Sequence, residues 1–159
     1  MNKWEFCSVV QGILICGVLT RLPLNAQSQK IQAQRLIEIT AQKHPEITGL
    51  ELSATPPGKE SCITIAATES KGIGEKCDED EATALKTEKP FVEHEPDGFD
   101  VTAPLHDAGG KLIGTLGIDY KPQPGQTEGD VLKGTAQLLR EIERQIPSNV
   151  FLFQTVSGH

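Results

Sequence analysis

Two adjacent segments in the second half of the chain decide the fold. Residues 99–105 read FDVTAPL, and residues 111–120 read KLIGTLGIDY. Apolar and polar residues alternate in the first segment, which is typical of a strand with one buried face. Between the two segments, residues 107–110 read DAGG, a sequence that suits the tight turn of a hairpin. The pattern predicts a β-hairpin, so at least part of the sheet is antiparallel.

Three more strands are expected upstream, at residues 48–54, 61–68 and 89–95. The second of them is rich in β-branched side chains, which favour strands. A turn at residues 55–58 separates the first two, and a glycine-containing loop with a short helix separates the second from the third. Pro104 lies inside the first strand of the hairpin and has no N–H to donate. That end of the strand is therefore expected at a bulge or beside an open edge.

Three helices are expected around these strands. Residues 29–43 carry an apolar side and end at His44, because the proline that follows disfavours helix. Residues 78–86 begin with the acidic run DEDE, which suits the positive end of a helix better than a calcium loop, since the acids are contiguous and no glycine follows. Residues 127–146 form a closing helix with an apolar stripe. One sheet covered by helices makes a single α+β domain, expected over residues 27–159.

The start of the chain resembles a secretion signal. Residues 7–20 are apolar and uncharged, but too short to span a bilayer comfortably. Such a short apolar core is typical of a signal peptide over residues 1–26, with cleavage after Ala26. A periplasmic or secreted location follows from this interpretation. The alternative is an uncleaved membrane anchor, because Glu5 and Arg21 depart from the usual signal pattern.

The composition argues against nucleic acid as a partner. The chain carries 15 Lys and Arg against 22 Asp and Glu, a net charge of −7. An acidic surface repels phosphate backbones. With one Trp, one Tyr and five Phe, the chain is also poor in the aromatic side chains on which bases stack.

Two of the four cysteines, Cys62 and Cys77, lie beyond the predicted signal peptide. In an oxidising compartment an even pair is compatible with a disulfide, which here would close a loop of about 15 residues. The alternative is two free thiols with Cys62 buried in a strand. The sequence leaves both open, because a disulfide requires a geometry that spacing alone does not provide.

Two stretches resemble the Cache family of PAS-like extracytoplasmic sensor domains. Residues 64–68 (TIAAT) with residues 73–78 (IGEKCD) are similar to the family's strand, polar loop and helix entry. The hairpin of residues 99–119 looks like its V-x-x-P-L-x-D-x-x-G-K-x-I-G-x-L-G-x-D pattern. The resemblance implies a five-stranded antiparallel sheet of order 2-1-5-4-3, with a long N-terminal helix on one face. Small ligands would bind on the other face, under the loop and the short middle helix.

The resemblance also implies what the domain binds. The expected ligand is a small carboxylate, amino acid or amine, and the expected partner is a separate membrane or signalling protein. Lys71 or Lys76 would pair with a ligand carboxylate, and Asp119 with a ligand amine. For each residue, an ordinary solvated or structural role is the competing interpretation. The full set of candidate ligand-binding residues is Thr68, Lys71, Lys76, Thr102, Thr115, Asp119 and Tyr120.

Catalysis and metal binding receive little support from the sequence. No nucleophile elbow, zinc-protease motif, phosphate loop or haem-attachment motif is present. His94 lies between Glu93 and Glu95, but adjacent strand residues point to opposite faces and do not converge on a metal. His106 is expected at a hairpin tip in solvent. The leading hypothesis is a non-enzymatic binding or sensor domain without a cofactor; the alternatives are an accessory protein that binds another protein and, third, an enzyme.

Overall fold

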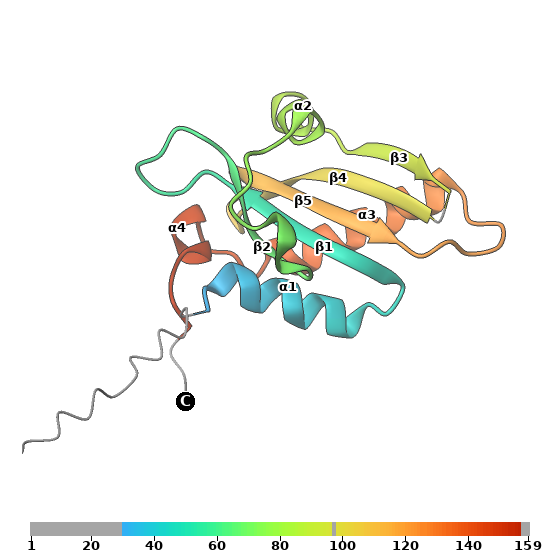
Figure 1. The fold of residues 1–159 in the computed structure, drawn as a ribbon, viewed down its shortest axis with the longest axis horizontal. Helices are drawn as coiled ribbons and strands as arrows, with labels where there is room; N and C mark the ends of the chain where they lie inside the picture. Colours follow the sequence, from blue (N-terminus) through green and yellow to red (C-terminus); the bar gives the residue numbers. More distant parts are fainter. Residues whose placement is uncertain (1–29, 97, 157–159) are drawn as a thin grey trace, which may run out of the picture.

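The computed structural model describes residues 30–96 and 98–156, so the predicted signal peptide lies outside the described residues. The described part contains a five-stranded antiparallel sheet of order β2-β1-β5-β4-β3 (Figure 1). This confirms the predicted sheet and its strand order. The observed bounds are close to the predicted ones: β1 Ile47–Ala54, β2 Ile63–Ala67, β3 Phe91–Glu95, β4 Gly98–His106 and β5 Leu112–Tyr120.

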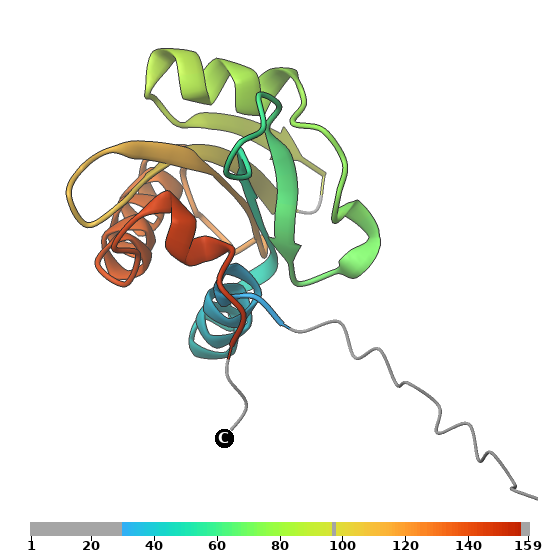
Figure 2. The same cartoon turned by 90° about the vertical axis from the view of Figure 1, so that its left-hand side faces the viewer.

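Helices cover both faces of the sheet unequally. Figure 2 shows α1, α3 and the short α4 on one side, and α2 alone on the other. The single turn α4 was not predicted, because four residues after Pro147 are too few to show a helical period. The bounds are α1 Gln32–Lys43, α2 Glu79–Thr87, α3 Glu128–Glu143 and α4 Asn149–Leu152, with a 3-10 turn η1 at Ser70–Gly72.

The hydrophobic core lies between the sheet and the pair α1 and α3. Alternate residues of the central strands point into it, among them Leu52 of β1, Val101 of β4 and Leu116 of β5, all completely buried. Ile37 of α1 and Ile142 of α3 meet them from the helices. Because strand side chains alternate, the residues between these apolar ones point to the opposite face. That second face is polar.

Pro104 lies beside an open edge of the sheet and next to a register shift, as predicted for a residue without an N–H. The ladder between β3 and β4 ends at the pair Phe91 and Thr102, so Pro104 lies beyond the reach of β3. The β4–β5 register also shifts between Leu105 and His106. A residue without an N–H is therefore accommodated at the end of the strand.

The acidic run caps α2, as the sequence predicts. Asp78 is the N-cap, and its Oδ1 accepts the backbone N–H groups of Asp80 at 3.0 Å and Glu81 at 2.9 Å. Glu81 Oε2 accepts the backbone N–H of Asp78 at 2.9 Å, which completes a capping box. The helix-start role of this run is confirmed, and the run also serves the polar face described below.

Tyr120 points away from the polar face, contrary to its predicted role beside Asp119. Its side chain is 6% exposed and lies between the sheet and α3, where the hydroxyl is 3.1 Å from Thr135 Oγ1. Burial raises the pKa of this phenol. The physical reason is the two-residue period of β5, which sends Asp119 and Tyr120 to opposite faces.

Replacing Tyr120 with Phe tests this structural role. The change removes the hydrogen bond and leaves the buried Thr135 hydroxyl without its partner, so the free energy of unfolding is expected to fall by about 1 kcal/mol. Urea denaturation of Tyr120→Phe, Thr135→Val and the double variant measures the coupling. Strictly additive losses in the double variant would contradict a direct bond between the two hydroxyls.

Candidate functional site

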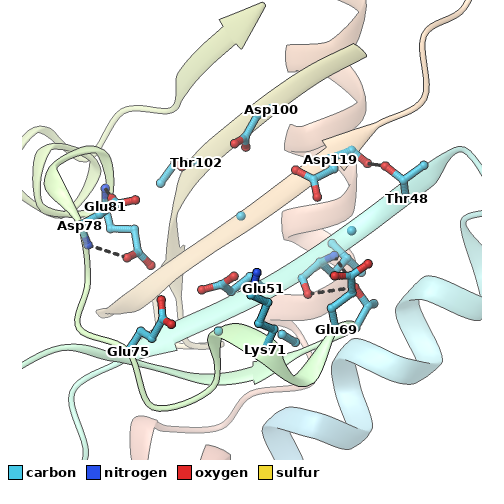
Figure 3. Close-up of a pocket in the computed structure, with 16 residues that line it drawn as sticks. Thr48, Glu51, Glu69, Lys71, Glu75, Asp78, Glu81, Asp100, Thr102 and Asp119 are labelled. Carbon is cyan, nitrogen blue, oxygen red and sulfur yellow. Dashed lines mark hydrogen bonds between the residues drawn. The ribbon is translucent and has the colours of Figure 1, made fainter. Parts of the chain in front are cut away.

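A cavity of about 510 Å³ lies over the polar face of the sheet. Figure 3 shows its floor on β1, β4 and β5, with the segment between β2 and α2 on one side and the start of α2 on another. Its volume is within the range of small-molecule sites, roughly 300 to 1,000 Å³. The lining residues are Thr48, Gly49, Leu50, Glu51, Ala67, Thr68, Glu69, Lys71, Gly72, Glu75, Asp78, Glu81, Asp100, Thr102, Gly117 and Asp119.

Three carboxylates rise from the floor (Figure 3). Asp100 of β4 is the direct partner of Asp119 in β5, so these two side chains are neighbours on one face. Glu51 of β1 is paired with Gly117 of β5. Two glycines keep the floor low: a Cβ on Gly49 would lie 1.9 Å from Asp119 Oδ2, and Gly117 adds no side chain above the sheet.

Glu51 is held in place by buried hydroxyls. Thr64 Oγ1 donates to Glu51 Oε1 at 2.5 Å, and Ser53 Oγ donates to Thr64 Oγ1 at 3.2 Å. Ser53 is completely buried and Thr64 is 2% exposed. A hydrogen bond to a carboxylate is stronger than one between neutral groups, so this chain orients Glu51 at the base of the cavity.

The walls add further acids. Glu69 and Glu75 come from the segment before α2, Asp78 is the N-cap of that helix, and Glu81 comes from its first turn. Glu81 is fixed twice, because its Oε1 also accepts Thr115 Oγ1 at 3.1 Å. Among the described residues, the lining therefore includes seven carboxylates and a single lysine, Lys71.

This concentration of acid is unfavourable to the empty protein. Burial and the neighbouring negative charges, Asp119 first, raise the pKa of Asp100 from 3.8 to about 6. Between these two pH values the folded chain holds a proton on Asp100 that the unfolded chain releases. The free energy of unfolding consequently falls as pH rises through that window. At neutral pH the ionised Asp100 is a source of destabilisation.

The carboxylates do not converge on one point. In residues 30–96 and 98–156, no group of three or more His, Cys, Asp or Glu side chains is arranged to hold a metal ion. A divalent cation requires several oxygen ligands within about 2.6 Å. The negative charge is instead spread over the floor and walls, which suits a larger ligand.

The cavity continues past the Asp100–Asp119 pair. A second hollow of about 270 Å³ shares Thr48, Asp100 and Asp119 with the first and extends toward Glu95 and Gly98. Thr48 donates its hydroxyl to the Asp119 carbonyl at 3.2 Å at this junction. The two hollows make one trough along the polar face, with acidic residues in both parts.

Four of the predicted ligand-binding residues line the cavity: Thr68, Lys71, Thr102 and Asp119. Three do not line this larger hollow. Tyr120 borders the second hollow, although its side chain packs on the helix face. Lys76 is exposed where it pairs with Ile63 at the edge of the sheet, and Thr115 is buried beneath Glu81.

Sequence reasoning missed the two floor acids Glu51 and Asp100. The signal was present, because Glu51 alternates with Leu50 and Leu52, and Asp100 alternates with Phe99 and Val101. Each therefore belongs to the same polar face as the predicted residues. The acids of the walls had no comparable signal, since loop and helix positions reach the cavity only through tertiary packing.

The three histidines of the described residues lie outside the lining of the larger cavity. His106 was expected in solvent, but it is half-buried, with Nδ1 3.1 Å from Glu143 Oε1 and Nε2 3.5 Å from Glu88 Oε2. That expectation was wrong because α3 passes beside the hairpin. His94 is exposed and 3.3 Å from Glu128.

Cys62 and Cys77 are joined in a disulfide, with their Cα atoms 5.4 Å apart. The bond connects the residue before β2 to the residue before the N-cap of α2. It therefore lies at the end of the segment that walls the cavity.

Solved GAF domains share this fold. The GAF domain of a two-component sensor histidine kinase from Bacillus halodurans superposes with a TM-score of 0.53 at 14% identity, over 74% of this chain and 95% of that chain. The GAF domain from an Acinetobacter phosphoenolpyruvate-protein phosphotransferase gives 0.53 at 11% identity, over 77% and 84%. No protein-family model and no curated protein sequence matches the chain.

A third similar structure is an enzyme. The type II free methionine-R-sulfoxide reductase from Thermoplasma acidophilum is 15% identical over 72% of this chain and 92% of that chain, with a TM-score of 0.47. A likeness at this level carries no argument about catalysis. At 11–14% identity the two GAF domains show a shared fold, whereas the function of a domain depends on the residues of its own site.

The Cache assignment is therefore wrong, and the fold is GAF-like. The resemblance rested on two stretches, residues 64–78 and the strand–turn–strand motif of residues 99–119. GAF and PAS domains contain comparable hairpins, so the motif predicts the sheet without separating the families. In the described ranges, no helix combines the length and apolar character that a bilayer span requires.

Replacing Asp100 with Asn tests the electrostatic stress in the cavity. At pH 7.5 the free energy of unfolding is expected to rise by about 1 to 2 kcal/mol, after allowance for solvent screening of this half-buried group. At pH 4 the difference should nearly vanish, because Asp100 is protonated in the folded chain. Urea denaturation at both pH values measures it. Glu60→Gln, at an exposed acid outside the cavity, is the control; an equal gain at both pH values would indicate repacking instead.

Proposed function

We propose that this chain is a non-catalytic binding or sensor domain for a small organic cation, with an amine as the recognised group. The observation that carries the proposal is the acidic cavity, in which seven carboxylates face a single lysine. Opposite charges attract more strongly in a partly dehydrated cavity than in water. Burial first, and then repulsion by Asp119 and other acids, raise the pKa of Asp100, and a protonated amine beside it would offset both effects.

The same charge balance makes a simple carboxylate a poor ligand. Lys71 offers one positive charge, whereas Glu51, Asp100 and Asp119 oppose an anion from the floor. An amino acid is intermediate, because Lys71 can pair with its carboxylate while the floor acids bind its amine. Amines without a carboxylate are therefore expected to bind best, and diamines are favoured by the trough that continues toward Glu95.

Binding is favoured over catalysis by the kinds of side chain present. The described lining of the larger cavity includes no cysteine, histidine, serine or tyrosine that would serve as a nucleophile beside a base. A sensing role is further supported by the GAF fold of the Bacillus halodurans domain, which belongs to a two-component sensor histidine kinase. We infer an exported location from the signal-like residues 1–26, and a separate signalling protein as the partner.

A thermal-shift panel tests the ligand class. Aliphatic amines, diamines and guanidines should raise the melting temperature at neutral pH, with stabilisation of about 2.7 kcal/mol at 100 times the dissociation constant. Amino acids should give smaller shifts, and simple carboxylates none. Inorganic calcium and zinc salts report on metal binding.

Two variants make the panel specific. Gly117→Val adds bulk to the floor at a position where a Cβ makes only ordinary contact with Glu51 at 3.5 Å, so it should abolish the amine shift while the fold remains. Glu60→Gln removes one exposed acid outside the cavity and should leave the shift unchanged. Stabilisation by carboxylates and not by amines, or equal amine shifts in Gly117→Val, would refute the proposal.

Affinity for an amine should depend on pH through Asp100. Since its pKa is about 6, the carboxyl gains its charge between about pH 5 and 7, whereas an aliphatic amine with a pKa near 10 stays protonated throughout. Binding should therefore tighten as pH rises through this range and level off above it. Isothermal titration calorimetry in amine-free buffer measures the profile. Asp100→Asn should weaken binding and flatten the profile; a profile of unchanged steepness in this variant would show that another group titrates.

A further inference from the structure

We propose that the Cys62–Cys77 disulfide is a redox latch on the wall of the acidic cavity, so that its reduction releases the wall and weakens ligand binding. The inference deepens the proposed function and rests on it for the role of the cavity. Its structural part, the loosening of the wall on reduction, stands on the contacts of the segment itself.

The segment between β2 and α2 supplies much of the cavity. Residues 68–78 contribute Thr68, Glu69, Lys71, Gly72, Glu75 and Asp78 to the lining. They include the single lysine and three of the seven carboxylates. Movement of this segment would therefore change both the shape and the charge of the site.

Apolar burial contributes little to holding this segment. From Thr68 to Thr83 no side chain is buried, and the first buried residue that follows is Ala84 in the middle of α2. Ile73, the one large aliphatic residue of the segment, is 44% exposed. Regions with few buried apolar contacts open locally at low free energy. The segment therefore depends on hydrogen bonds and on the disulfide.

The hydrogen bonds lie along the free edge of β2. Thr64 donates its N–H to the Glu75 carbonyl at 2.9 Å, and Gly74 donates to the Thr64 carbonyl at 2.9 Å. Cys77 donates to the Cys62 carbonyl at 3.2 Å. These three bonds join the segment to the outermost strand of the sheet, and each contributes only about 1 kcal/mol of net free energy. The Cys62–Cys77 disulfide lies beside these hydrogen bonds and links the start of β2 covalently to the end of the segment.

Reduction removes this link without touching the core. A dithiol reductant breaks the sulfur–sulfur bond, supplies two electrons and two protons to make two thiols, and is itself oxidised to a disulfide. Neither cysteine belongs to the apolar cluster between the sheet, α1 and α3. The loop of sequence separation 15 is then closed by the edge hydrogen bonds and by the contacts of α2 with the sheet, among them the bond from Thr115 to Glu81. Opening of the wall becomes more frequent, while the sheet persists.

Hydrogen–deuterium exchange followed by mass spectrometry tests the latch on the full chain, with Cys7→Ser and Cys16→Ser in every sample so that one disulfide responds. Oxidised protein is compared with dithiothreitol-treated protein and with Cys62→Ser/Cys77→Ser. Relative to the oxidised protein, amide exchange across residues 68–82 should be about tenfold faster or more in the dithiothreitol-treated protein and in the double serine variant. Peptides from β1, β4 and β5 should keep their protection. Dithiothreitol should add nothing to the double serine variant.

Two outcomes would overturn the proposal: unchanged exchange in residues 68–82, or a uniform loss of protection that includes the central strands. The second would make the bond a staple of the whole fold. The affinity for a diamine, measured on the same samples, should fall by about tenfold on reduction; an unchanged affinity also overturns the latch. If the oxidised protein binds no cation at all, the proposed function fails, and the exchange data still decide whether the wall is released.

Discussion

The structure depends on the two-residue alternation of side chains in the central strands. Leu116 and Ile118 of β5 enter the core under α1 and α3, while Gly117 and Asp119 face the other way. Any slip of one residue would exchange the two faces and bury the acids. The register that protects the core therefore also assembles the acidic floor, and fold and site have one physical origin.

Under the proposed function, the polar face is a compromise between stability and binding. Glu51 is oriented by buried hydroxyls, and Asp100 remains next to Asp119 although the pair repels. A more stable domain would place neutral side chains there. Proteins tolerate such local stress where a ligand relieves it. The raised pKa of Asp100 and the open, glycine-lined floor are thus two aspects of one arrangement that favours a cation.

Much of this could be anticipated from local patterns. The hairpin, the helix start at Asp78 and the polar face of the strands follow from short-range rules. The strand order does not, and it was expected only from the resemblance to PAS-like sensor domains. The family assignment did not, because a hairpin motif is common to related folds. The side chain of Tyr120 was expected beside Asp119, but the two-residue period of the strand sends it to the helix face. Lys76 was expected to border the covering loop, but it lies exposed at the sheet edge. The wall acids Glu69 and Glu75 lacked any periodic signal.

The sequence by itself determined the α+β class, the five strands with their closing hairpin and which side chains share a face, because alternation and capping are local properties of the backbone. Only the tertiary structure decided that the acids of three strands, a loop and a helix surround one cavity, and that the Cys62–Cys77 bond lies at its wall. These contacts join residues that are far apart in the chain. They depend on how the helices and strands pack, which local sequence patterns do not specify.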